Sequence, residues 1–162
     1  EAYDRGNGAA ALLFDPVRQK VLLTRQFRLP TYINGNENGF LTEVCAGLLD
    51  GDAPEDCMKR EILEETGYAV TSVEKVAEVY TSPGAVTEKL YLYQAEYNPG
   101  LKRESGGGVA AESEDIQVLE WSYTEVFEAL KKGEIRDAKT VILLQHALIF
   151  GPLKDCVPDS NR

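Results

Sequence analysis

The chain has 162 residues, 43% of them hydrophobic, so it is long enough for one domain with a real core and too short for two. Its 17 basic and 27 acidic residues give a formal net charge of -10, which argues against nucleic acid or an anionic membrane as a partner. No apolar stretch approaches the length of a membrane span, and no charged-then-apolar leader is seen. Three cysteines without C-x-x-C spacing fit a reduced compartment, so we expect a cytoplasmic protein.

Alternation of apolar and polar residues predicts six strands, with helices between and after them. The strands are expected near residues 8–14, 20–28, 42–46, 70–80, 88–97 and 116–121. A helix over 123–132 is indicated by a Ser122-x-x-Glu125 capping box and by Gly133, and another over 138–150 ends before Gly151-Pro152. Mixed strands flanked by helices predict an α/β sandwich over residues 1–153, followed by a loose tail over 154–162.

The most informative segment is Arg60-Glu61-Ile62-Leu63-Glu64-Glu65-Thr66-Gly67-Tyr68. In a helix, Glu61 lies next to both Glu64 and Glu65, so like charges crowd together on one stripe. A hard divalent cation would relieve that repulsion, because it prefers carboxylate oxygens. The alternative is an ordinary solvated acidic helix face.

Residues before this run predict where its helix begins. Asp52 is a candidate N-cap with Glu55 as its capping-box partner, and Pro54 suits the first turn. Gly67 suits the left-handed residue that ends the helix. Carboxylates are unfavourable at the negative end of a helix, so the acidic stripe indicates a functional site.

Taken together, residues 47–68 resemble the Nudix box of pyrophosphohydrolases, G-x5-E-x7-R-E-U-x-E-E-x-G-U, where U is a bulky apolar residue. The half from Arg60 to Tyr68 matches closely. Counted back from Arg60, the other half is one residue short, and the glutamate expected early in the box is missing, although Asp52 and Glu55 lie nearby.

The resemblance extends over nearly all of residues 3–153 and is to the branch that hydrolyses nucleoside-diphosphate sugars. It is carried by Tyr3-Asp4-Arg5-Gly6-Asn7-Gly8, Arg25-Gln26-Phe27-Arg28, Asn34-Gly35-Asn36-Glu37, Ser82-Pro83-Gly84, Gly106-Gly107-Gly108 and Gly133-Glu134-Ile135-Arg136-Asp137. It implies the Nudix αβα sandwich with a mixed sheet. It also implies a homodimer, built partly by an N-terminal segment that is largely absent from these residues.

The same resemblance implies the catalytic and metal-binding residues. Glu61 and Glu65 would bind Mg2+, with Mn2+ as an alternative, and Glu64 would assist. Arg60 would orient a glutamate, and Ala46 would lend a backbone carbonyl to the metal.

The glycine run 106–108 lies in a stretch of small and acidic residues. It is either a disordered surface loop or a hinge that carries an acidic side chain towards the metal. By family position Glu114 is the expected metal ligand and candidate general base, with Glu112 as the fallback.

Substrate contacts are implied at eight positions, any of which could instead be ordinary surface or turn residues. They are Arg28, Gly47, Leu48, Glu65, Glu88, Ser113, Glu114 and Lys139, with Arg25 a weaker candidate. The guanidinium of Arg28 would suit a diphosphate. His146, the sole histidine, faces an apolar helix and is expected to be packed or half-exposed, which disfavours a Ser-His-Asp hydrolase.

Together with the resemblance, these residues predict Mg2+-dependent hydrolysis of the P-O-P bond of a nucleoside-diphosphate sugar. The resemblance implies GDP-mannose, giving GMP and mannose 1-phosphate, as the leading substrate. Two alternatives remain open, a pyrophosphatase for ADP-ribose or a UDP-sugar, and a catalytically silent Nudix-fold module that binds a nucleotide.

Overall fold

A computed structural model describes residues 1–108 and 115–156 of the chain. The strands are β1 (Gly8–Asp15), β2 (Lys20–Phe27), β3 (Phe40–Glu43), β4 (Cys45–Leu48), β5 (Glu74–Tyr80), β6 (Lys89–Glu96) and β7 (Gln117–Ser122). The helices are α1 (Leu29–Ile33), α2 (Pro54–Thr66), α3 (Tyr123–Lys131) and α4 (Ala138–Ile149), with 3-10 turns η1 (Pro99–Leu101) and η3 (Lys154–Cys156).

The strands form one mixed sheet in the order β3-β2-β1-β6-β5, and β4 and β7 extend it by pairing with β1 and β2. Strand β1 is parallel to β6 and antiparallel to β2 and β4. Its run of alanines and leucines is buried on both faces, as expected of a central strand covered by helices on each side. The predicted α/β class is therefore confirmed.

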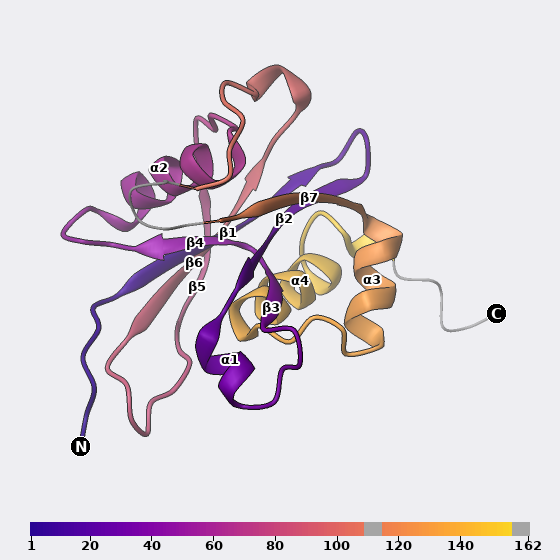
Figure 1. Cartoon of the computed structure of the whole chain (residues 1–162). Helices are drawn as coiled ribbons and strands as arrows, with labels where there is room; N and C mark the ends of the chain where they lie inside the picture. The colour runs from indigo at the N-terminus through magenta and orange to yellow at the C-terminus, as the bar shows by residue number, and fades with distance from the viewer. Residues whose placement is uncertain (109–114, 157–162) are drawn as a thin grey trace.

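Helix α2 covers one face of the sheet, and α3 and α4 cover the other (Figure 1). Alternate residues of β1 point to the two sides: Ala9 and Leu13 pack beneath α2, whereas Ala10 and Leu12 pack beneath α4. The result is three layers, helix, sheet and helices, with two apolar cores.

Several predicted boundaries were wrong. The strand expected at 42–46 is two strands separated at Val44, and the strand expected from residue 70 begins at Glu74. Helix α1 was not predicted, since its five residues include a proline and show no helical period. The capping box of Ser122 and Glu125 at the start of α3 is confirmed, as is the left-handed Gly67.

Candidate functional site

Two carboxylates of α2 lie on the helix face that covers the sheet. Cys57, Met58 and Ile62 form the apolar part of that face. Glu61 and Glu65, one turn apart, share it and are only 8% and 1% exposed. Glu64 lies to the outside and is half-buried, so the predicted stripe of three acids has an inner pair and an outer member.

Arg60 forms ion pairs with three acidic residues around it. Its Nη1 lies 2.9 Å from Oε1 of Glu61 and 3.1 Å from Oε2 of Glu64, and its Nε lies 3.5 Å from Oδ2 of Asp52. Burial works against the charge of Arg60, but the two glutamates raise its pKa. The predicted role of Asp52 as N-cap was wrong, because Ala53 occupies that position without a side-chain hydrogen bond and the Asp52 carboxylate is near Arg60 instead.

The C-terminal end of α2 is held by the glycine-containing segment. Gly107 and Gly108 donate backbone hydrogen bonds to the carbonyls of Glu65 and Glu64, and Lys102 Nζ donates one of 2.7 Å to the Thr66 carbonyl. The backbone carbonyl groups of Thr66 and its neighbours lie in the last turn of the helix, where they would otherwise have no hydrogen-bond partner. Gly107 and Gly108 are thus attached to the acidic helix, which the alternative of a disordered surface loop did not predict. The alternative of a hinge stays a prediction. Ser113, Glu114 and Glu112 lie outside the described residues.

Strand β4 approaches the same carboxylates from the sheet. The backbone N-H of Ala46 donates a 3.3 Å hydrogen bond to Oε2 of Glu65. Gly47 lies so close to Glu61 that a Cβ there would be 2.1 Å from the Glu61 Cδ. The main chain at Ala46 and Gly47 is therefore in direct contact with the acidic pair.

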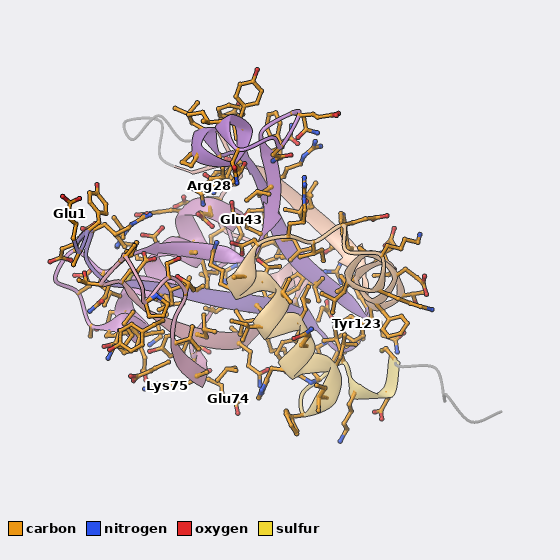
Figure 2. All side chains as sticks on the ribbon, turned by 90° about the horizontal axis from the view of Figure 1, so that it is seen from below. Glu1, Arg28, Glu43, Glu74, Lys75 and Tyr123 are labelled. Carbon is orange, nitrogen blue, oxygen red and sulfur yellow. The ribbon has the colours of Figure 1, made fainter. Side chains whose placement is uncertain are left out.

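A second charged cluster lies across the cavity from α2. Arg28, immediately after β2, donates from Nε and Nη2 to the two carboxylate oxygens of Glu43, at 2.7 and 3.0 Å. Figure 2 shows these two side chains beside each other. Lys139 Nζ also donates to Glu43 Oε2 and, at 2.8 Å, to Asp137 Oδ1. Burial disfavours the Glu43 carboxylate, but Arg28 and Lys139 hold its pKa below the usual value.

The first turn of α4 fixes the position of Lys139. Asp137 is its N-cap and accepts a hydrogen bond of 3.0 Å from the Thr140 N-H. The Thr140 hydroxyl in turn accepts 2.8 Å from the backbone N-H of Val44, the residue that separates β3 from β4. These hydrogen bonds connect the backbone around Lys139 to Val44, the residue that follows Glu43.

A cavity of about 520 Å3 joins the two clusters. The predicted residues that line it are Arg28, Ala46, Gly47, Leu48, Arg60, Glu61, Glu65, Glu88 and Lys139. Glu88 is paired with Arg5 at 3.4 Å. Arg25 is not among the lining residues, and its guanidinium lies over the Phe40 ring instead.

The sequence interpretation missed Glu43, Asp137 and Arg5, which also line the cavity. A signal was available for the first, because a glutamate between Thr42 and Val44 is unusual in a strand that leads into the core. His146 is half-buried and its ring lies 5.6 Å from that of Phe150, so the expected packed or half-exposed histidine is confirmed.

The inner pair suits a hard divalent cation in its chemistry. Glu61 and Glu65 offer carboxylate oxygens beside the backbone of Ala46 within one cavity, the donor type that such ions prefer. Among residues 1–108 and 115–156, no group of three or more His, Cys, Asp or Glu side chains is arranged to hold a metal ion. In the described part of the site, Glu61 and Glu65 are the carboxylates of α2 that line the cavity, and Glu43, Glu88 and Asp137 line it from other segments.

The thiols are not part of this chemistry. Cys45 of β4 and Cys57 of α2 are buried in the core between that helix and the sheet, and burial together with the nearby Glu61 raises the pKa of the Cys57 thiol to about 11. A thiol with so high a pKa is a poor nucleophile and metal ligand. Among the described residues, no helix has both the length and the apolar character that a membrane span needs.

Comparison with known proteins agrees with this geometry. The NUDIX domain matches residues 4–144, and the chain belongs to the Nudix family. It is 55% identical over 151 residues to the GDP-mannose pyrophosphatase of Pectobacterium atrosepticum, covering 93% of this chain and 77% of that protein. The GDP-mannose pyrophosphatases of Cronobacter sakazakii and Shigella flexneri are 54% and 53% identical, over 93% and 90% of this chain and 78% and 75% of their own lengths. Nudix hydrolases generally use divalent metal cations.

Proposed function

We propose that this chain hydrolyses the pyrophosphate bond of a nucleoside-diphosphate sugar with Mg2+, and that GDP-mannose is its substrate. The observation that carries the proposal is one cavity with an acidic pair, Glu61 and Glu65, on one side and two cations, Arg28 and Lys139, on the other. A diphosphate needs both, because its oxygens bind cationic side chains directly and carboxylates only through a metal. The names of the relatives support the choice of GDP-mannose.

In this account the residues divide the reaction between them. Arg28 and Lys139 would bind and orient the diphosphate, while Glu61 and Glu65, with the Ala46 carbonyl, would hold the cation. A bound divalent cation supplies charge neutralisation and lowers the pKa of water. Arg60 keeps Glu61 oriented through the 2.9 Å ion pair. Glu114, proposed as a further metal ligand and general base, and Ser113, proposed as a substrate contact, lie outside the described residues.

Hydrolysis adds water to one phosphorus and breaks its bond to the bridging oxygen. GDP-mannose would give GMP and mannose 1-phosphate. Because the water proton must leave as the bond forms, a carboxylate within reach of that water is required as general base. ADP-ribose and UDP-sugars contain the same bond and stay as alternative substrates, because the side chains that carry the proposal would contact the diphosphate and not the base.

The experiment is to measure monophosphate release from GDP-mannose, ADP-ribose and UDP-glucose with Mg2+, with Mn2+ and with chelator. We expect GDP-mannose to be cleaved with the highest kcat/KM, and chelator to abolish cleavage. Preferential cleavage of ADP-ribose would transfer the assignment to that substrate. Binding of a nucleotide sugar without cleavage under any condition would favour the silent binding module.

We also propose that the protein is a cytoplasmic homodimer, as the resemblance implied. Light scattering coupled to size exclusion tests the dimer, and a monomer at micromolar concentration would contradict it.

A further inference from the structure

We infer that Glu43 is a positioning residue for substrate binding: its buried carboxylate holds Arg28 and Lys139 in the geometry that receives the diphosphate. This inference rests on the proposed function and assigns a role to a residue that contacts neither metal nor the bond to be cleaved.

Glu43 is placed to act on both cations together. It is 2% exposed and lies at the end of β3, between the end of β2, which leads to Arg28, and the first turn of α4, which carries Lys139. One oxygen accepts from Arg28 Nε and the other from both Arg28 Nη2 and Lys139 Nζ. A single carboxylate thus connects cations from two elements that are far apart in sequence.

The geometry of the Arg28 pair leaves the guanidinium suited to phosphate. A guanidinium has five N-H groups in a planar fork. Glu43 takes the Nε-Nη2 edge, so the Nη1-Nη2 edge has the geometry that matches two phosphate oxygens. Without Glu43 the Arg28 side chain, 39% exposed, would have many rotamers open to it.

Lys139 is fixed in the same way. Its ammonium has three donors, of which Glu43 and Asp137 accept two. Asp137 is itself held as the N-cap of α4. The two carboxylates therefore fix the direction of the third N-H of the Lys139 ammonium. The Lys139 side chain is only 12% exposed.

Two opposing effects decide what removal of Glu43 does. Its negative charge repels an anionic diphosphate, so its loss would favour binding if charge alone mattered. Its hydrogen bonds place two cations, and ordering such side chains anew costs free energy on each binding event. We expect placement to outweigh repulsion, because the repulsion is largely offset by the two cations that lie between Glu43 and the substrate.

The test compares three variants for GDP-mannose hydrolysis and for GDP-mannose binding in chelator. Glu43→Gln removes the charge, and Glu43→Asp keeps the charge but shortens the side chain so that it no longer reaches both cations. Glu120→Gln is the matched control, because Glu120 is also bound bidentately by an arginine, Arg18, but does not line the cavity.

We expect KM and the chelator-state Kd to rise at least tenfold in Glu43→Gln and at least fivefold in Glu43→Asp, with kcat within threefold of wild type. The Mg2+ concentration for half-maximal rate should change less than twofold, and Glu120→Gln should match wild type in KM. Should Glu43→Gln fail to fold, Glu43→Asp decides the question.

Unchanged or lowered KM in the Glu43 variants would overturn the inference and leave Glu43 a structural or repulsive residue. Absence of both binding and turnover in the wild type would instead contradict the proposed function, so the two failures are distinguishable.

Discussion

Gly47 of β4 lies directly against the carboxylate of Glu61, so close that a Cβ at residue 47 would stand 2.1 Å from the Glu61 Cδ. The backbone of Gly47 is not in a left-handed conformation, so the requirement for glycine at this position is one of space alone. The acidic pair of α2 and the main chain of β4 therefore fit together only when residue 47 lacks a side chain.

Gly47→Ala should consequently reduce turnover without unfolding the protein. The Glu61 side chain can turn away from the added methyl group, but it then leaves its position in the cavity. We expect kcat to fall about 100-fold, the order of effect that a misplacement of about 1 Å produces, with little change in the melting temperature. Gly84→Ala is the control, since a Cβ there meets nothing within 4 Å. Wild-type activity in Gly47→Ala would show that Glu61 needs no fixed position.

The sequence predicted those parts of the site that depend on local spacing. The i,i+4 relation of Glu61 and Glu65 and the left-handed Gly67 follow from helical geometry alone. The family resemblance added Arg28 and Lys139, which the fold brings to one cavity.

What the sequence did not predict depends on contacts between distant segments. Glu43 meets Lys139 across 96 positions, and no local pattern encodes that meeting. Asp52 satisfied the rule for an N-cap, but the pairing with Arg60 eight residues later took precedence. The break between β3 and β4 at Val44 likewise reflects the Thr140 hydroxyl of another element.

The attachment of the glycine segment to α2 predicts that Gly106 is intolerant of a side chain. Its φ is +72°, and a Cβ would lie 2.6 Å from the Thr66 carbonyl carbon. Gly106→Ala should lose about 2–4 kcal/mol of unfolding free energy, from left-handed strain and overlap together.

Gly35→Ala separates these two causes. Its φ is +91° but nothing lies within 4 Å of a Cβ there, so only the strain of about 1–2 kcal/mol applies. Urea unfolding of both variants checks the difference. An equal loss of unfolding free energy in the two variants would mean that the backbone around Gly106 can move to accommodate the added methyl group without further cost.

The environment of Asp15 leads us to expect that the stability of the fold depends on pH, independently of catalysis. Burial raises the cost of its charge, yet hydrogen bonds from Arg18 and from the Val17 N-H hold its pKa below the usual value. A lowered folded-state pKa adds stability above the unfolded pKa of about 3.9, and this is lost as pH falls through the folded pKa.

Asp15→Asn should therefore cost about 1–2 kcal/mol of unfolding free energy at pH 7, allowing for the partly exposed Arg18. The difference from wild type should shrink as the pH falls below about 4, where the carboxylate takes up its proton in the unfolded state, and it should be lost below the lower folded-state pKa. Chemical unfolding at pH 7 and pH 3 measures both. A difference that stays constant across this range would contradict the assignment, and KM should be unchanged throughout.

The most direct test of the metal-dependent site is GMP release from GDP-mannose by wild type and Glu65→Gln, each with Mg2+ and with chelator. Glu65 is 1% exposed and faces the cavity, whereas Glu55 lies exposed in the first turn of the same helix and serves as the control in Glu55→Gln. We predict Mg2+-dependent release by wild type and Glu55→Gln, and a loss of about 100-fold or more in a folded Glu65→Gln. Equal rates in Glu65→Gln and wild type, or release that chelator leaves unchanged, would contradict the account.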